Sequence, residues 1–241
     1  MKPVITFALP IFNSSSILWL QLESLCNQNT TIPWELITCE DPSENFCGEE
    51  YFKPYKQRLQ EAGCVNFKYI ELDKWVPLSY KWKILADFSN SENFILGSSD
   101  DYSPPNRIED SYKGLSTYTK VDWEKVIFYN LHTGTKALWT TPEDKTGIFA
   151  ALKTEAVLKT KPPYPTRGVD GWIKDNHGEF SLYRIKDLPL GLGTDGANNL
   201  SCDRSKAYLD PNTPFTLWEE DLNNLIPKSL LIKLNKQYKL Y

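Results

Sequence analysis

The first hundred residues alternate hydrophobic segments with amphipathic ones, and this alternation constrains the fold more than any single motif. Residues 4–9, 34–39, 65–70 and 93–97 are short, rich in β-branched, aromatic and other apolar residues, and typical of strands. The segments between them have helical spacing, with Leu18, Leu22 and Leu25 at i, i+4 and i+7 as the clearest case. Strands that alternate with helices predict an α/β fold, in which helices flank a mostly parallel sheet on both faces.

The boundaries of three helices can be predicted from local signals. The serine run at 14–16 offers N-caps for the first helix. The second helix is expected at residues 52–62, and Gly63 would end it as a C-cap. The third is expected at residues 80–89.

Acidic residues follow two of the predicted strands. Phe94, Ile95 and Leu96 lead through a short polar stretch to Asp100 and Asp101, and the strand at 34–39 runs into Glu40 and Asp41. Ligands of open α/β sheets bind at the carboxyl ends of strands, and cations that carry phosphates are held by one or two carboxylates. The pattern favours a metal–diphosphate site. A turn is the alternative, because two aspartates shortly before proline are also ordinary turn chemistry.

Beyond Pro105 the alternation loosens. Strands are expected at residues 125–130, 137–139, 147–153 and 180–185, and helices at 154–159 and 168–176. Loops are expected at the Pro-rich residues 161–166 and in the Gly-rich stretch that continues through Asn199. Residues 215–241 have a helical pattern that Pro227 interrupts. The expected organisation is one domain at 1–214, with halves at 1–104 and 105–214, followed by a helical tail at 215–241.

Composition excludes several classes of protein. With 41% hydrophobic and 24% charged residues, the chain is typical of a globular protein. A formal net charge of −4 argues against nucleic acid as a partner, since nonspecific binding needs a basic surface. No signal-peptide pattern or apolar run of membrane-spanning length is visible, and five scattered cysteines fit reduced thiols. A cytoplasmic location is expected.

Several segments together resemble a known family. Ile5-Thr-Phe-Ala-Leu-Pro-Ile-Phe-Asn13, Leu22-Glu-Ser-Leu-Cys-Asn-Gln28 and Glu40-Asp-Pro-Ser43 resemble the opening of family 2 glycosyltransferases of the GT-A fold. That family commonly has an Asp-x-Asp-Asp motif, in which Ser98 here replaces the first aspartate while Asp100 and Asp101 match the second and third. The resemblance covers roughly residues 4–200 and depends on the order and spacing of these segments.

The resemblance implies a function for each half of the chain. Residues 1–104 would bind a nucleotide-diphosphate sugar, with a UDP-sugar as the expected donor, and residues 105–214 would bind the acceptor. The reaction would be an inverting, metal-dependent transfer of the sugar to a hydroxyl of a glycan or lipid-linked acceptor, in glycan or polysaccharide synthesis. Mn²⁺ or Mg²⁺ would be the cofactor.

The family pattern also assigns the metal and donor residues. Asp100 would be the main metal ligand and Asp101 the second. Ser98, Ser99 and Asp100 would contact the donor, although the serine at 98 leaves one negative charge fewer than usual. A turn-capping role for Asp100 is the alternative.

Residues after the first two strands would bind the nucleoside. Pro10 and Phe12 would line the base, and Glu40 or Asp41 would accept a hydrogen bond from its imide or from a ribose hydroxyl. The alternative is that both acidic residues only open a turn at Pro42.

A lysine and an aspartate complete the expected site. Lys81 would reach a phosphate as a point charge, or it is a solvated lysine on a helix face. Arg167-Gly-Val-Asp-Gly-Trp-Ile173 resembles the family segment that holds the catalytic base, which makes Asp170 the candidate general base. An N-cap role for Asp170 is the alternative.

Two other functions and one accessory role stay open. A nucleotidyltransferase also places carboxylates at a parallel sheet. Its usual phosphate loop after the first strand is rich in glycine and has a basic residue, and residues 10–16 have neither feature. A non-catalytic carbohydrate-binding protein would use the eight tryptophans. Lysines that alternate with aliphatic residues after Pro227 could provide peripheral membrane contact, or the tail packs on the domain.

Overall fold

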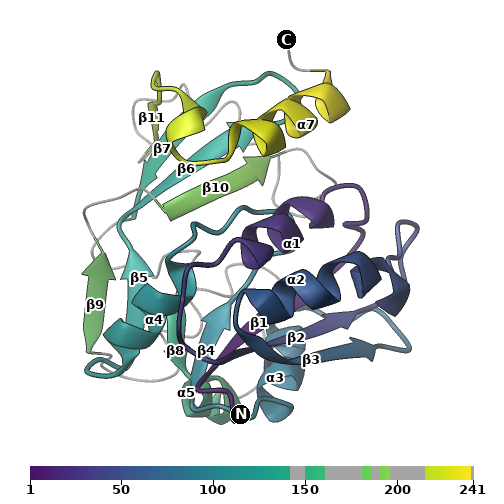
Figure 1. Ribbon diagram of the computed structural model, residues 1–241, viewed down its shortest axis with the longest axis vertical. Coiled ribbons are helices and arrows are strands. Elements are labelled where there is room, and N and C mark those ends of the chain that lie inside the picture. The colour runs from purple at the N-terminus through teal and green to yellow at the C-terminus, as the bar shows by residue number, and fades with distance from the viewer. Residues whose placement is uncertain (142–149, 161–180, 186–189, 196–214, 240–241) are drawn as a thin grey trace.

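The computed structural model describes residues 1–141, 150–160, 181–185, 190–195 and 215–239 (Figure 1). Its strands are β1 (Ile5–Ile11), β2 (Trp34–Glu40), β3 (Cys64–Glu71), β4 (Asn93–Leu96), β5 (Lys120–Trp123), β6 (Lys125–Asn130), β7 (Lys136–Thr140), β8 (Ala151–Lys153), β9 (Leu182–Ile185), β10 (Leu190–Asp195) and β11 (Phe215–Leu217). Its α-helices are α1 (Leu18–Cys26), α2 (Lys56–Glu61), α3 (Leu78–Asp87), α4 (Arg107–Leu115), α5 (Thr154–Lys159) and α7 (Lys228–Tyr238), and 3-10 helices occupy Glu49–Tyr55 and Leu222–Asn224.

The strands form two sheets. In the part of the chain that the structure describes, the larger sheet has the order β3-β2-β1-β4-β8-β5-β9. The strands β1 to β4 are parallel, β8 is antiparallel to both of its neighbours, and β5 is parallel to β9. The smaller sheet has the order β10-β6-β7-β11 and is antiparallel except where β10 pairs with β6. A mostly parallel sheet flanked by helices, with a smaller antiparallel part, confirms the expected fold class.

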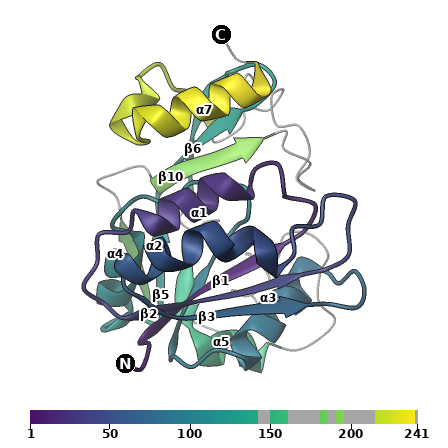
Figure 2. The ribbon, with the colours of Figure 1, turned by 45° about the vertical axis from the view of Figure 1, so that its right-hand side comes forward.

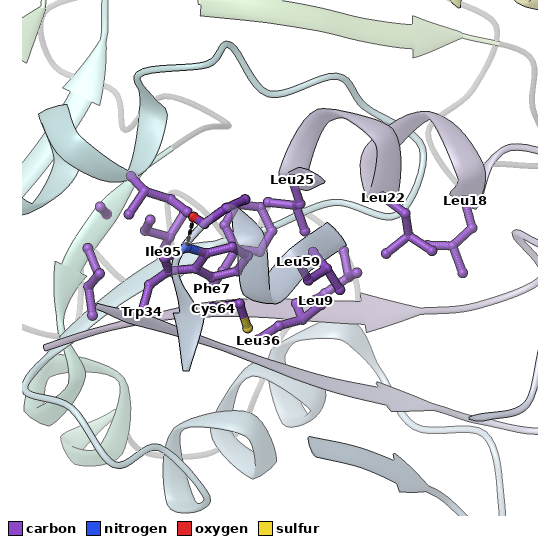
Figure 3. Packing of buried hydrophobic residues seen from close by; sticks show 14 of the residues in the cluster. Phe7, Leu9, Leu18, Leu22, Leu25, Trp34, Leu36, Leu59, Cys64 and Ile95 are labelled. Carbon is purple, nitrogen blue, oxygen red and sulfur yellow. Dashed lines mark hydrogen bonds between the residues drawn. The ribbon is translucent and has the colours of Figure 1, made fainter. Parts of the chain in front are cut away.

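Helices cover both faces of the larger sheet, because side chains alternate along each strand. Phe7 and Leu9 of β1 pack in a cluster with α1, α2 and α4, and Figure 3 shows Leu18, Leu22 and Leu25 of α1 lying over this face. On the other face, Ala8 of β1, Ile37 of β2 and Phe94 of β4 pack against α3 and α5 in a second cluster. The apolar stripe predicted for α1 is therefore confirmed as its buried face.

The end of α2 and the start of α1 can be compared with the predictions made from the sequence. Gly63 has φ +89° after α2, as expected for a glycine that ends a helix. The serine run does not supply a side-chain cap, because α1 begins at Leu18 and Ile17 precedes it as the N-cap residue. Instead, the carbonyl of Ser14 accepts hydrogen bonds from the backbone N–H groups of Ile17 and Leu18, so the prediction of a serine side-chain cap is wrong.

The second half differs more from the sequence-based prediction. The helix at 154–159 is confirmed as α5, and the strands at 125–130 and 137–139 as β6 and β7. The Gly-rich stretch expected to be a loop contains β10, and 215–217, expected to be helical, is strand β11. The structure also has α4 and β5, which no sequence signal had indicated. The predicted helix at 168–176 lies outside the described residues.

The C-terminal helix α7 is part of the packed structure. Leu230 and Leu234 are buried in a third hydrophobic cluster, with Trp19 and Leu20 of α1 and Ile127 of β6. Figures 1 and 2 show α7 against the smaller sheet, with α1 lying between this layer and the larger sheet. Leu230 and Leu234, two of the aliphatic residues considered for membrane contact, therefore face the protein. None of the helices that the structure describes combines the length and hydropathy needed to cross a bilayer.

Candidate active site at the carboxyl ends of the parallel strands

Loops that follow β1, β2 and β4 contact one another at one edge of the sheet. Asn13, which follows β1 with φ +54°, accepts hydrogen bonds at its side-chain oxygen from the backbone N–H (3.1 Å) and the side-chain amide (2.8 Å) of Asn45. The hydroxyls of Ser14 and Ser99 lie 2.8 Å apart, which joins the loops after β1 and β4. The residues predicted to bind the donor are therefore brought together at this edge.

A buried ion pair lies at the centre of this edge. The ammonium of Lys81 contacts the carboxylate of Asp41, with the side chains 3% and 0% exposed. Lys81 also donates to the carbonyl of Ile11 at 2.7 Å, and its nitrogen lies 5.3 Å from the ring centre of Phe12. Burial lowers the pKa of Lys81, and Asp41 opposes this effect by favouring the charged form. Lys81 is therefore not the solvated helix-face lysine considered from the sequence.

The two acidic residues after β2 have different partners. Glu40 accepts hydrogen bonds from the backbone N–H groups of Cys47 and Gly48 at 2.8 and 3.0 Å and from the hydroxyl of Tyr69 at 2.8 Å. It therefore anchors the loop that follows β2. Asp41 accepts from the N–H of Val76 at 3.0 Å in addition to its contact with Lys81. This arrangement places Asp41, rather than Glu40, between the loop after β1 and the start of α3.

The loop after β4 holds the predicted metal ligands. Ser98 donates a hydrogen bond to the carboxylate of Asp100. Asp100 and Asp101 are 9% and 6% exposed. Gly97 makes this loop possible, because a Cβ atom there would lie 2.4 Å from the carbonyl oxygen of Ala8.

The two aspartates differ in their electrostatic surroundings. Arg107, at the start of α4, is fully buried and donates to the carbonyl of Leu96 at 2.8 Å and to the hydroxyl of Ser103 at 2.7 Å. Burial lowers the pKa of Arg107 to about 9, and the charge of Asp101 opposes that change. The charge of Asp101 thus helps to stabilise Arg107 inside the protein, which leaves Asp100 as the better candidate for a cation.

The carboxylates fit a divalent cation that is shared with a phosphate ligand. Among the described residues, no group of three or more histidine, cysteine, aspartate and glutamate side chains is placed to hold a metal. Mg²⁺ and similar hard cations are commonly bound by one or two carboxylates, while substrate phosphates and water complete the coordination. Asp100 and Asp101 match this donor set and do not match a dedicated protein cage.

The structure describes some of the remaining predicted residues but not the candidate base. Pro10 is buried in β1, and Phe12 is half-buried beside Lys81. Asp170, the candidate base, lies outside the described residues.

The sequence-based prediction missed three residues that join the segments of the candidate site. Ser14 and Asn13 connect the loops, and Val76 provides a backbone donor to Asp41. Their roles depend on contacts between residues at least 30 positions apart. The serine run was the only signal available, and it favoured a helix cap instead.

Neither a protein-family model nor a curated protein matches the chain. Solved structures do match. S. aureus TarS 1–349 in complex with UDP-GlcNAc has a TM-score of 0.65 and 13% identity over 85% of this chain. The same protein in complex with UDP has a TM-score of 0.64 and 14% identity over 85% of the chain. The fold is that of GT-A glycosyltransferases.

A third structure extends the comparison. The mannosyltransferase PcManGT from Pyrobaculum calidifontis, in complex with GDP-Man and Mn²⁺, has a TM-score of 0.55 and 12% identity over 86% of this chain. The chain spans about three fifths of the length of these structures, at 63%, 62% and 61%. At such identities the similarity concerns the GT-A-like fold, and it does not by itself assign the chain to family 2.

Proposed function

We propose that this chain is a glycosyltransferase that moves a sugar from a nucleoside-diphosphate sugar to a hydroxyl of a glycan or lipid-linked acceptor. The observation that supports this most directly is the meeting of the loops after β1, β2 and β4, which places the Asp41–Lys81 pair and the Asp100–Asp101 pair at one edge of a GT-A-like sheet. Ligands of open α/β sheets bind at this edge. The structural neighbours that were solved with UDP-GlcNAc, UDP or GDP-Man support a nucleotide-sugar donor.

The nucleoside would bind between the loops after β1 and β2. Phe12 offers an aromatic face, and Asp41 offers carboxylate oxygens that can accept from an imide N–H or a ribose hydroxyl. Lys81 holds Asp41 in place through the buried ion pair, so we assign it a positioning role at the nucleobase rather than the direct phosphate contact considered from the sequence. A uracil base, and hence a UDP-sugar, fits this set of groups.

The diphosphate would bind at the loop after β4. Mn²⁺ or Mg²⁺, when bound by Asp100, would neutralise the charge that develops on the leaving diphosphate. Asp101 would add negative charge while it stays electrostatically coupled to Arg107. Ser98 orients the carboxylate of Asp100 by donating to it, and the hydroxyl of Ser99 contacts Ser14.

The acceptor would bind in the second half of the chain, with Asp170 as general base. A carboxylate that removes the proton of the acceptor hydroxyl allows a single displacement, which inverts the configuration at the sugar carbon. This assignment depends on the family resemblance around residues 167–173.

Calorimetric titration of the protein with UDP, UDP-sugars and GDP-mannose, each with and without Mn²⁺, tests the proposal. We expect tighter binding with Mn²⁺, followed by release of UDP when an acceptor is added. Asp100→Asn should lose the Mn²⁺-dependent part of binding, while Asp87→Asn, an exposed residue at the end of α3, serves as the matched control.

Three outcomes would contradict the proposal. Binding without any transfer or hydrolysis would favour a carbohydrate-binding protein, and formation of a nucleotide-sugar from a nucleoside triphosphate would favour a nucleotidyltransferase. If a chelator does not change nucleotide binding and Asp100→Asn does not change it either, Asp100 is not a metal ligand.

A further inference from the structure

A fully buried arginine bridges the two ends of the loop that carries Asp100 and Asp101. The guanidinium of Arg107, which is 0% exposed, donates to the carbonyl of Leu96 at 2.8 Å and to the hydroxyl of Ser103 at 2.7 Å. Leu96 is the last residue of β4, where the loop begins, and Ser103 follows the two aspartates, where the loop ends. Because the guanidinium is planar and its donors have a fixed geometry, these two contacts set the distance between the ends of the loop.

Polar side chains of α1 hold the second end of the same loop. The side-chain amide of Gln21 donates to the hydroxyl of Ser103 at 3.2 Å, and the hydroxyl of Ser24 accepts from the backbone N–H of Ser103 at 3.2 Å. Gln21 and Ser24 are both fully buried. Gln28, just after α1, donates to the carbonyl of Pro104 at 2.8 Å. The chain that leaves the loop is therefore fixed to a helix that packs on the larger sheet.

The surroundings of Arg107 stabilise a charge inside the protein. The carbon of its guanidinium lies 5.2 Å from the ring centre of Phe7 in β1 and 6.0 Å from that of Trp123 in β5, within the range of cation–π attraction. Burial lowers the pKa of Arg107 to about 9, which leaves the guanidinium charged at neutral pH, and the charge of Asp101 opposes the effect of burial. Arg107 thus contacts three strands of the larger sheet as well as the end of the loop.

Stability alone does not explain a charged residue at this position. Buried ion pairs can often be replaced by hydrophobic side chains of similar volume without loss of stability. A hydrophobic residue could fill the space between the two aromatic rings, but it could not donate hydrogen bonds to Leu96 and Ser103. What the arginine adds is therefore a defined geometry for the loop between these two residues.

We propose that Arg107 is a positioning residue, which holds the ends of this loop so that Asp100 and Asp101 present their carboxylates to one divalent cation and the diphosphate. Arg107 acts through the loop and touches neither the cation nor the substrate. Groups that orient metal ligands from outside typically change metal affinity by about 10- to 100-fold when they are removed. This inference rests on the proposed function, since it assumes that a cation and a diphosphate bind at this loop.

Three variants test this role through the effect of Mn²⁺ on UDP binding. Calorimetric titration with UDP in the presence and absence of Mn²⁺ gives two affinities, whose ratio we call the Mn²⁺ enhancement. Arg107→Met should reduce the enhancement roughly tenfold and leave the metal-free affinity nearly unchanged. Arg107→Lys should restore it only in part, because an ammonium is a point donor and cannot bridge both ends of the loop. Ser103→Ala keeps the charge but removes one end of the bridge, so it should reduce the enhancement by less than Arg107→Met does.

Leu59→Ala is the control that separates positioning from stability. Leu59 is 1% exposed in α2, which packs against β3, and β2 and β1 lie between β3 and β4 in the larger sheet. Its truncation should lower the Tm and leave the Mn²⁺ enhancement unchanged. If Arg107→Met also lowers the Tm but keeps the full enhancement, Arg107 is a structural residue and the inference is overturned. An equal loss of UDP affinity with and without Mn²⁺ would overturn it as well.

The remaining outcomes distinguish this inference from the proposed function. If Arg107→Met does not fold, Arg107→Lys and Ser103→Ala decide, and full enhancement in both overturns the inference. If Asp100→Asn abolishes the enhancement while the variants of Arg107 and Ser103 keep it, the positioning role is overturned and the proposed function stands. If the unaltered protein binds no nucleotide, the proposed function fails and the inference fails with it.

Discussion

The ammonium of Lys81 and the carboxylate of Asp41 form a buried ion pair that joins the first turn of α3 to the end of β2. Lys81 also donates to the carbonyl of Ile11, so one side chain connects three segments of the candidate nucleotide site. The burial of both groups means that neither can lose its partner without leaving a charge or a polar group unpaired.

Removing one partner should therefore be costly. Lys81→Met leaves the buried carboxylate of Asp41 without its cation while the Val76 N–H still donates to it, and we expect a loss of about 3–5 kcal/mol in the free energy of unfolding. The double variant Asp41→Asn/Lys81→Met should lose less than the sum of the two single variants, because no unpaired charge remains. Urea unfolding of the four proteins measures this coupling, and additive losses would contradict the pair.

Gly97 should not tolerate a side chain. A Cβ atom at this position would lie 2.4 Å from the backbone oxygen of Ala8 and 2.5 Å from the ring of Phe7, and both groups belong to the central strand β1. We expect Gly97→Ala to lower the free energy of unfolding by about 1–3 kcal/mol, the usual cost of overpacking. Because the loop of Asp100 begins here, UDP affinity should fall as well. An unchanged thermal unfolding curve would show that β1 and this loop can separate freely.

The first half of the fold could be predicted because its signals are local. Two apolar patterns predict burial without reference to distant residues: the stripe of Leu18, Leu22 and Leu25 and the run from Phe94 to Leu96. The structure confirms that both are buried. The loops that carry the acidic residues could also be predicted to lie at one edge of the sheet, since the strands before them are parallel, and contacts of Asn13 with Asn45 and of Ser14 with Ser99 join these loops.

The features that were missed depend on distant partners. Strand β11 exists because residues 215–217 pair with β7, and β10 because it pairs with β6; neither segment alternates clearly enough to predict this. Glu40 or Asp41 was expected to contact the nucleoside, and the hydrogen bonds that Glu40 accepts from Cys47, Gly48 and Tyr69 are ones that no local pattern indicates.

The ion pair between Glu23 and Arg58 should make stability depend on pH. Arg58 donates to both carboxylate oxygens of Glu23, at 3.0 and 2.7 Å, and thereby lowers the pKa of Glu23 below its ordinary value of 4.5. A lowered folded-state pKa means that the stabilisation is present above about pH 4.5 and is lost as the pH falls through the folded-state value. Glu23→Gln should lower the free energy of unfolding by about 0.5–1 kcal/mol at pH 7 and by almost nothing at a pH below the folded-state pKa of Glu23. Unfolding curves at both pH values check the sign, and a cost that grows on acidification would refute it.

The C-terminal helix should be needed for stability. Leu234 is 0% exposed and packs in the cluster that joins α7 to α1 and β6, whereas Ile232 on the same helix is 56% exposed. Leu234→Ala should lower the free energy of unfolding by about 2–4 kcal/mol, and Ile232→Ala, the matched control, by far less. Equal effects would mean that α7 does not pack in solution as it does in the structure, and liposome binding would then be worth measuring.

Asp170 should act in the chemical step rather than in nucleotide binding. Removing a general base costs about 10²- to 10⁴-fold in rate, so Asp170→Asn should lower kcat within that range and leave the affinity for UDP nearly unchanged. Glu155 offers a control, because it lies in α5 far from the candidate site and forms an ion pair with Lys159. Lys153, the residue before α5, pairs with Asn93 at the amino end of β4. That end is opposite to the loop of Asp100, so Glu155→Gln should leave kcat unchanged. Single-turnover transfer rates at saturating donor measure both variants. Full activity of Asp170→Asn would move the base to another carboxylate of the acceptor half, such as Asp175 or Glu179.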